Sequence, residues 1–183
     1  MQKALVLGAT GFFGRHFIKK ASAEMEITAL NSKSCDLLTD KLYNINERMN
    51  STVLNYWKEL QPQAKFVTFG SSCSYSDDAL RIEDNYLLGS CESGYEVYGM
   101  VKRMLLVGLR ALAQEYGMKY MFFVPSCLYG PDYDQKDKHF IYDLVRKICD
   151  AKYKKAEPVV LWGTGFQRRE LIFIDDAVDI ILK

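Results

Sequence analysis

Two residues four positions apart, Tyr98 and Lys102, have the types and spacing that acid–base chemistry requires. They fall within a helical pattern over residues 98–116, so their side chains share one face about one turn apart. A phenol, with a reference pKa of about 10, is a poor acid or base at neutral pH, but a neighbouring positive charge stabilises its phenolate. Tyr98 would then exchange a proton with a substrate oxygen. The plain alternative is a tyrosine packed beside a solvated lysine.

A serine follows a candidate strand in the middle of the chain. Residues 65–69 form an apolar run that predicts a buried strand, and Gly70-Ser71-Ser72-Cys73 comes directly after it. The carboxyl ends of parallel strands are where such sheets bind their ligands. Ser71 is therefore a candidate to hydrogen-bond a carbonyl oxygen of a substrate.

A glycine-rich turn near the N-terminus has the pattern of a dinucleotide site. Three glycines lie between a strand-like run at residues 3–7 and a helical pattern at 13–22. The first permits a tight turn, the second lets the backbone approach a pyrophosphate, and the third allows close packing of helix on strand. The helix N–H groups are then free to hold phosphate oxygens, whereas an ordinary glycine-rich turn is the alternative. The candidate cofactor contacts here are Gly8, Thr10, Gly11, Phe12, Phe13 and Gly14.

The residues after the second strand-like run, at 25–30, bear on the kind of dinucleotide. Asn31 and Lys33 offer no carboxylate to a free ribose 2′-hydroxyl, while Lys33 suits a 2′-phosphate. We therefore favour NADP(H) as the cofactor, leave NAD(H) open, and count Asn31, Lys33 and Asp36 among its contacts. The positive ring of a bound nicotinamide would add to Lys102 in stabilising a Tyr98 phenolate.

The remaining pattern predicts strands alternating with helices. Continuous apolar strands in this order imply an α/β fold, with a doubly wound parallel sheet covered by helices on both faces. One domain over residues 1–183 is the economical interpretation. Further strands are expected at 120–124, 158–162 and 171–174, further helices at 139–152 and after an N-cap at Asp175, and the end of the 98–116 helix at Gly117.

Composition narrows the classes of partner. The chain has 183 residues, 49% of them hydrophobic, and a formal net charge of +1, which allows one well-buried core. Lysine and arginine are scattered, so no footprint for nucleic acid or a membrane surface is expected, while a small anionic ligand is compatible. No apolar stretch approaches the roughly 20 residues of a membrane span, and no signal-peptide pattern precedes the first strand, so we expect a cytoplasmic protein. The 5 cysteines lack metal-type spacing and predict free thiols without a metal site.

The order of these motifs resembles the extended short-chain dehydrogenase/reductase superfamily. The glycine turn is followed by Ser71, then by Tyr98 and Lys102, and then by Leu-Tyr-Gly-Pro at residues 128–131. Within it, Gly-Ser-Ser-Cys at residues 70–73, a histidine at 139 opening a helix, and the residues from Trp162 to Asp176 look most like the GDP-L-fucose synthase family. The resemblance implies a Rossmann-like NAD(P)-binding domain in which a substrate-binding region begins at about residue 126.

The resemblance also implies roles for single residues. In that family a GDP-linked 4-keto-6-deoxy sugar is epimerised beside its ketone and then reduced there by NADPH. Tyr98, supported by Lys102 and Ser71, matches the proton donor of the reduction, and Cys73 and His139 match the acid and base of the epimerisation. A small buried thiol and a surface histidine are the plain alternatives. The candidate substrate contacts are Ser72, Cys127, Lys147, Trp162 and Arg169, of which Arg169 matches the arginine on the nucleotide diphosphate. A homodimer through the long helices is implied as well.

The sequence departs from the family pattern in three places. Between residues 40 and 46 it lacks a helix and a strand of the family, and it ends soon after Asp176, where the family continues into a region that closes over the sugar nucleotide. Because a lost internal strand would leave a gap in the sheet, we expect an interruption of the natural chain near residues 40–46, a truncated protein being the alternative. Cys127 occupies the position where the family has asparagine, which leaves the identity of the sugar open. The competing functions are an NAD-dependent nucleotide-sugar epimerase or dehydratase without net reduction, and a non-catalytic nucleotide-binding relative.

Overall fold

The computed structural model describes residues 2–30, 42–133, 140–154, 158–161 and 163–183. In chain order its elements are β1 (Gln2–Leu7), α1 (Phe12–Ala21), β2 (Met25–Leu30), α2 (Leu42–Leu60), β3 (Phe66–Phe69), the 3-10 helices η1 (Ser72–Ser74) and η2 (Glu83–Asn85), α3 (Glu96–Tyr116), β4 (Tyr120–Phe123), β5 (Cys127–Tyr129), α4 (Phe140–Lys154), β6 (Leu171–Phe173) and α5 (Ile174–Leu182). They form two compact units. The central unit is Leu30–Pro125, and the split unit joins Met1–Ala29 to Ser126–Lys183.

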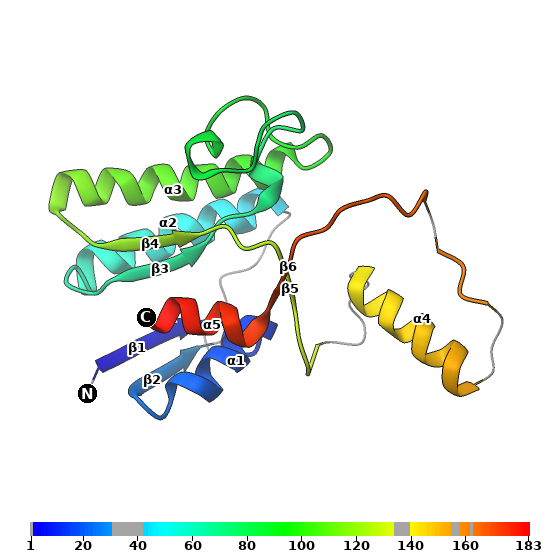
Figure 1. The fold of residues 1–183 in the computed structure, drawn as a ribbon. Coiled ribbons are helices and arrows are strands. Elements are labelled where there is room, and N and C mark those ends of the chain that lie inside the picture. The colour runs from blue at the N-terminus through cyan, green and yellow to red at the C-terminus, as the bar shows by residue number, and fades with distance from the viewer. Residues whose placement is uncertain (1, 31–41, 134–139, 155–157, 162) are drawn as a thin grey trace. The chain divides into compact units, whose positions relative to one another are not determined.

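The central unit is built on a parallel pair of strands. β3 pairs with β4 in register from Phe66 opposite Tyr120 to Phe69 opposite Phe123. Helices α2 and α3 cover one face of this pair (Figure 1). Alternate residues of a strand point to the same face, and Tyr120 and Phe122 accordingly both pack against the helices. The apolar core between the layers consists of Trp57, Leu105, Leu109 and Met118.

The buried residues of helix α3 recur every four positions, and the helix ends where the sequence predicts. Val101, Leu105 and Leu109 recur every four residues and are each at most 3% exposed, so one stripe of the helix is buried. Gly117 caps the helix in the left-handed conformation, with φ of 70°, and its N–H donates to the carbonyl of Ala113. The predicted helix over residues 98–116 and its glycine stop are therefore confirmed.

The split unit holds the other two strand pairs. β1 and β2 are hydrogen-bonded neighbours, and β5 pairs with β6 in parallel, with Cys127 opposite Leu171. Helix α1 packs against α5, where the His16 Nδ1 lies 3.4 Å from the Asp175 carboxylate and Lys20 forms an ion pair with Asp179. Ile174 and Val178 of α5 are fully buried beneath this contact.

Most predicted elements are confirmed, and two are wrong. Residues 158–161 are not a strand: they pair with no neighbour among the described residues, and Val160 is 72% exposed, so the apolar run has no ladder to join. Asp175 is not the N-cap of α5 but lies in its first turn, because the helix begins at Ile174 directly after β6, with Phe173 as the cap. The sequence reasoning missed α2 and β5. The interruption expected near residues 40–46 stays a prediction, because residues 40 and 41 lie outside the described residues. The single domain over residues 1–183 also stays a prediction.

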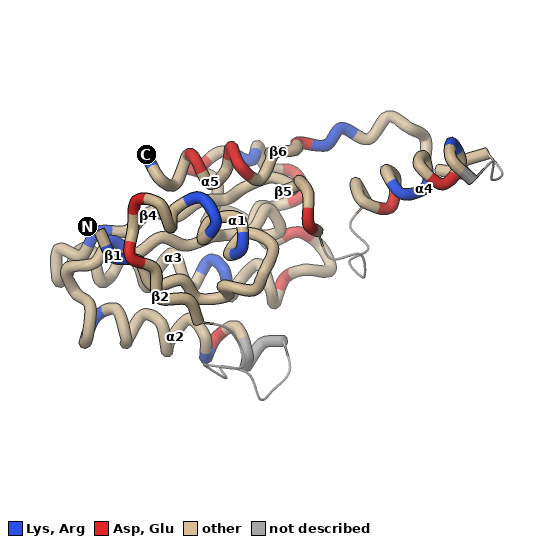
Figure 2. Tube along the Cα trace, turned by 90° about the horizontal axis from the view of Figure 1, so that it is seen from below, with Lys and Arg blue, Asp and Glu red and all other residues tan. Residues whose placement is uncertain are grey.

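The distribution of charged residues agrees with the prediction that lysine and arginine are scattered. Basic and acidic residues are interspersed along the described part of each unit (Figure 2). The thiols of Cys73, Cys91, Cys127 and Cys149 are free, as predicted for them. None of the described helices is both long and apolar enough to cross a membrane.

Candidate active site

Tyr98 and Lys102 lie in the first two turns of α3, beside the end of β3. Both side chains are partly buried, and the Lys102 Nζ lies 5.7 Å from the centroid of the Tyr98 ring. The same ammonium donates a hydrogen bond of 3.4 Å to the carbonyl of Phe69, the last residue of β3. The lysine thus ties the helix to the carboxyl end of the strand, where a parallel sheet places its ligands.

Ser71 and Cys73 reach the same place from the loop that follows β3. The Ser71 hydroxyl accepts a hydrogen bond of 3.2 Å from the N–H of Cys73 and caps η1. It also lies close enough to the Tyr98 phenol to lower the pKa of that phenol. The three residues that the sequence predicts for proton delivery, Ser71, Tyr98 and Lys102, are therefore brought together within the central unit.

Burial controls the ionisation of this cluster. It raises the pKa of the Tyr98 phenol; a thiolate at Cys73 would raise that pKa further, and the nearby Ser71 hydroxyl lowers it. Burial also lowers the pKa of the Lys102 ammonium. This corrects the expectation that the ammonium holds the pKa of the phenol down, because in the chain by itself desolvation is the larger effect. At neutral pH Tyr98 is a protonated phenol, the form that can donate a proton.

A glycine allows the loop after β3 to approach α3 this closely. A Cβ at position 99 would lie 2.6 Å from the carbonyl oxygen of Cys73 and 2.8 Å from the Sγ of Cys91. Both distances are shorter than van der Waals contact allows, so no larger residue fits between helix and loop. Because Gly99 directly follows Tyr98, this contact sets the distance from the phenol to Ser71 and Cys73.

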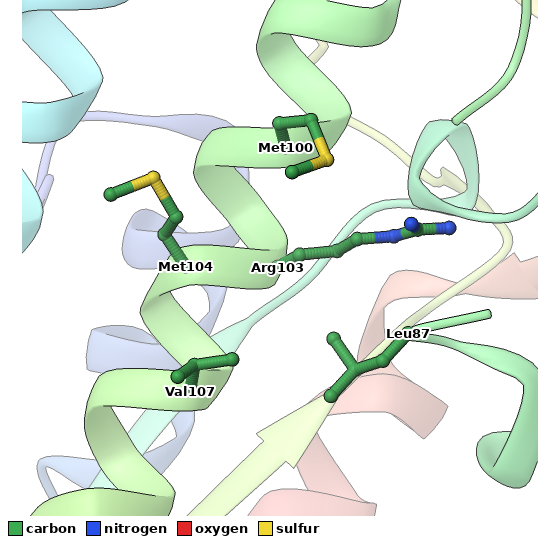
Figure 3. Close-up of a pocket in the computed structure, with 5 residues that line it drawn as sticks. All are labelled: Leu87, Met100, Arg103, Met104 and Val107. Atoms are coloured by element: carbon green, nitrogen blue, oxygen red, sulfur yellow. The ribbon is translucent and has the colours of Figure 1, made fainter. Parts of the chain in front are cut away.

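A buried arginine fastens the loop one turn further along the helix. Arg103 is 6% exposed and extends from α3 toward the loop (Figure 3). Its guanidinium donates to the carbonyls of Ser74 at 2.8 Å, Gly89 at 2.7 Å and Leu88 at 2.9 Å. Charge-assisted hydrogen bonds are the strong ones, and these join both ends of the loop to one helical position.

The glycine turn of the split unit has the geometry expected of it. Gly8 adopts a left-handed φ of 72°, and its carbonyl accepts from the Gly11 N–H at 2.9 Å. A Cβ on Gly14 would lie 2.4 Å from the Gly8 oxygen, so only glycine allows α1 to pack this close to the turn. Thr10 is exposed, and its carbonyl accepts from the Arg15 guanidinium at 2.8 Å. Gly8 and Gly14 thus have the conformational roles predicted for them.

The other candidates of the split unit lie in three separate surroundings. Cys127 is partly buried in β5; burial raises the pKa of its thiol, and the charge of Arg169 lowers it. Arg169 is exposed, with its guanidinium 5.7 Å from the centroid of the Phe140 ring, so Cys127 and Arg169 share one neighbourhood. Lys147 is instead paired on its own helix with Asp143, at 2.8 Å. Phe12 meets the edge of the Tyr133 ring, and Phe13 stacks on Phe17.

Known proteins share both the sequence pattern and the fold. The pattern of the NAD dependent epimerase/dehydratase family matches residues 31–183. The chain belongs to this family.

Relatives at the level of sequence are enzymes of GDP-sugar metabolism by name. A probable GDP-L-fucose synthase 1 of rice is 33% identical over 122 residues, which span 64% of this chain and 37% of the relative. The GDP-L-fucose synthase of Escherichia coli is 32% identical over 116 residues, 61% of this chain and 36% of the relative. The GDP-L-colitose synthase of Yersinia pseudotuberculosis is 26% identical across 98% of this chain and 70% of the relative. The chain thus spans well under half of the first two relatives.

Solved structures confirm the Rossmann-like α/β fold. A GDP-L-fucose synthetase from Naegleria fowleri, bound to NADP, superposes with a TM-score of 0.80 at 22% identity, over 99% of this chain and 72% of that one. A GDP-D-glycero-L-gluco-heptose synthase from Campylobacter jejuni gives a TM-score of 0.83 at 19% identity, over 99% and 73% of the two chains. The predicted class of fold, with its parallel strands, is therefore confirmed.

Several predicted site residues lie outside what the structure describes. They are Asn31, Lys33, Asp36, His139 and Trp162. Ser72 is described; it lies partly buried in η1, beside the central cluster. The roles of all these residues stay predictions.

Sequence reasoning missed the residues that hold the central cluster in place. Gly99 and Arg103 were not singled out, nor were Ser74 and Tyr86, which are buried beside them. One signal was available for the first. A glycine inside a helical pattern costs about 1 kcal/mol relative to alanine and indicates a close approach by another segment.

The close approach at Gly99 can be tested with a matched pair of substitutions in α3. Gly99→Ala should lower the free energy of unfolding by about 1 to 3 kcal/mol, because the new methyl group meets the Cys73 carbonyl. Gly108→Ala is the control, because its methyl meets only the Cδ1 of Leu54, the far end of a flexible side chain. Its change should stay within about 1 kcal/mol. Denaturant unfolding measures both, and equal losses would contradict the assignment.

Proposed function

We propose that this chain is the cofactor-binding and catalytic portion of a GDP-L-fucose synthase-like enzyme, an NADPH-dependent epimerase/reductase of a GDP-linked 4-keto-6-deoxy sugar. The observation that carries the proposal is the cluster of Ser71, Tyr98 and Lys102 at the carboxyl end of β3, in a chain of this family. The names of the relatives support the GDP-sugar, and the NADP in one solved structure supports the cofactor.

The reduction needs a proton at the carbonyl oxygen while a hydride reaches the carbon. NADPH, when bound, supplies the hydride. Tyr98 donates the proton, since burial keeps its phenol protonated at neutral pH. Ser71, which lies beside the phenol, orients the carbonyl, and Lys102 places a positive charge beside the phenolate that remains.

The epimerisation needs a base and an acid near the carbon next to the ketone. Such carbons lose a proton because the resulting enolate is delocalised. Cys73 belongs to the same cluster, since it lies close enough for a charge on its sulfur to raise the pKa of Tyr98. We assign Cys73 and His139 to this exchange, Cys73 from its place in the structure and His139 from the family resemblance alone.

The glycine turn and the exposed cations of the split unit are proposed to hold the two nucleotides. The turn after β1 leaves the N-terminus of α1 as the pyrophosphate site of NADP(H), with NAD(H) as the alternative. Arg169 is exposed and suits the paired oxygens of a diphosphate. Lys147, Cys127, Ser72 and Trp162 complete the proposed substrate contacts. A cytoplasmic location remains part of this proposal.

A second copy of the chain is the proposed protein partner. Val97, Met100, Met104 and Val107 recur along α3 at intervals of three and four residues and are between 48% and 52% exposed. Figure 3 shows Met100, Met104 and Val107 along the helix. With Leu87 and Arg103 they line a hollow of about 350 Å³. Apolar residues at this spacing form the seam of paired helices, which supports a homodimer through α3.

Tyr98→Phe separates reduction from cofactor binding. Removing the hydroxyl should lower kcat for NADPH oxidation by about a hundredfold or more, because no donor meets the carbonyl oxygen, and the Kd for NADPH should stay within about threefold. Tyr95→Phe, an exposed tyrosine at the start of the same helix, is the control and should keep full activity. NADPH absorbance and calorimetry measure the two effects. If Tyr98→Phe kept its activity, Tyr98 would not be the proton donor. A wild-type chain that binds NADPH without turning over any keto-sugar would indicate a non-catalytic relative.

Cys73→Ser should impair epimerisation before reduction. A serine hydroxyl is a far weaker acid than a thiol, so exchange of the hydrogen beside the ketone should slow by about ten- to a hundredfold. Proton NMR in heavy water follows this exchange. Cys149→Ser makes the same change at an exposed site in α4 and should leave the exchange unaltered. Unimpaired exchange in Cys73→Ser would remove Cys73 from the mechanism.

Val107→Glu tests the homodimer. A carboxylate in a seam between two helices would be buried without a partner, so the dimer dissociation constant should rise about a hundredfold. Val145→Glu, on α4 and 51% exposed against 52% for Val107, is the matched control. Sedimentation velocity over a range of concentrations reads out the assembly. A monomeric wild-type chain, or equal effects of both variants, would refute the dimer through α3.

A further inference from the structure

A chain of hydrogen bonds runs beneath the candidate site, from the loop after β3 to helix α3. The Ser71 N–H donates to the Tyr86 hydroxyl at 3.3 Å, and the Tyr86 hydroxyl donates to the Ser74 Oγ at 2.8 Å. The Ser74 hydroxyl donates in turn to the carbonyl of Gly99 at 3.1 Å. Tyr86 is 2% exposed and Ser74 is 0% exposed, so water does not compete for these bonds.

The two ends of this chain fix the direction of every bond in it. The Ser71 N–H can only donate, and the Gly99 carbonyl can only accept. Ser74 therefore gives its single hydroxyl proton to Gly99, and Tyr86 gives its own to Ser74. Because each hydroxyl proton can be donated in only one direction, the network has a single arrangement. Removing one hydroxyl would therefore leave buried polar atoms without a hydrogen-bond partner.

The network joins the backbone of the proposed helper, Ser71, to the residue that directly follows the proposed proton donor, Tyr98. At one end is the amide of Ser71, whose side chain lies close enough to Tyr98 to lower the pKa of the phenol. At the other end is the carbonyl of Gly99, the residue after Tyr98. Tyr86 spans the space between them and leaves the Ser71 Oγ out of the network, where it accepts from the Cys73 N–H and faces the phenol.

The surroundings of Tyr86 hold its ring in a single position. The ring meets the edge or face of Tyr75 at 5.2 Å and of Phe122 at 5.3 Å, both in T-shaped contacts. A Cβ on Gly70 would lie 2.6 Å from the Tyr86 hydroxyl oxygen. Aromatic packing would place a phenylalanine equally well, so the hydroxyl is the part of Tyr86 that packing does not explain.

We propose that Tyr86 is a positioning residue for the reduction, which holds the Ser71 backbone at a fixed distance from Tyr98 through its hydrogen bonds to Ser71 and Ser74. This inference rests on the proposed function. Tyr86 does not meet the substrate and acts only through Ser71. A displacement of about 1 Å at a reacting group costs up to about a hundredfold in rate, which is the scale of effect at stake.

The test compares Tyr86→Phe with Tyr75→Phe in the full chain. Both remove one hydroxyl from the same aromatic cluster, but only the first interrupts the network. Tyr86→Phe should lower kcat for reduction about ten- to a hundredfold while KM for the GDP-sugar and Kd for NADPH stay within about threefold. Tyr75→Phe should keep kcat within about twofold. If the Tyr86 hydroxyl had a purely structural role, Tyr86→Phe would lower the free energy of unfolding without this separate effect on kcat.

Hydrogen exchange at the Ser71 amide gives a second readout that needs no substrate. It should speed up about tenfold or more in Tyr86→Phe, because the amide loses its buried acceptor, and stay unchanged in Tyr75→Phe. An unaltered exchange rate at Ser71, or equal losses of kcat in the two variants, overturns the positioning role. Faster exchange in Tyr86→Phe together with a wild-type chain that reduces no GDP-keto-sugar overturns the proposed function and upholds the network.

Discussion

The arrangement of the candidate site depends on one contact, the close approach of the Cys73 carbonyl to the backbone of Gly99. A single methyl group at position 99 would fill the space between the loop and the helix. Because the phenol proposed to deliver the proton is on the preceding residue, the contact brings a turn of α3 and the end of β3 together at the candidate site. The ammonium of Lys102 on the Phe69 carbonyl and the guanidinium of Arg103 on three loop carbonyls reinforce it from either side.

Buried polar groups, rather than apolar packing, specify this part of the molecule. An apolar core consisting of Trp57, Leu105 and Leu109 holds the helices on the strands, but many side-chain arrangements would satisfy such a core. Arg103, Ser74 and Tyr86 are buried only because each finds defined partners, and leaving one of them unpaired costs about 1 to 3 kcal/mol. They therefore select one arrangement of the loop, the one that sets Ser71 against Tyr98.

The sequence predicts the reacting groups better than the groups that hold them. Tyr98, Lys102 and Ser71 can be found because helical spacing and the end of a strand are local patterns, and Gly8 and Gly14 because a tight turn demands glycine. The contacts of Tyr86 and Arg103 join segments far apart in the chain, and no local period reveals them. The strand expected at 158–162 is wrong for the same reason, since an apolar run becomes a strand only where another strand lies ready to pair with it.

The pKa shifts of Tyr98 and Lys102 indicate when the lysine acts. Burial raises the pKa of the phenol and lowers that of the ammonium, so before reaction the site disfavours charge on either group. A neutral phenol gains little from a cation whose nitrogen lies 5.7 Å from its ring centroid. In the proposed reduction, once the proton has passed to the substrate oxygen, the phenolate and the ammonium would attract each other across a partly desolvated space, where charges interact more strongly than in water. The lysine proposed for this site would thus stabilise the charge that develops during proton transfer more than it stabilises the resting site, which is the difference that lowers a barrier.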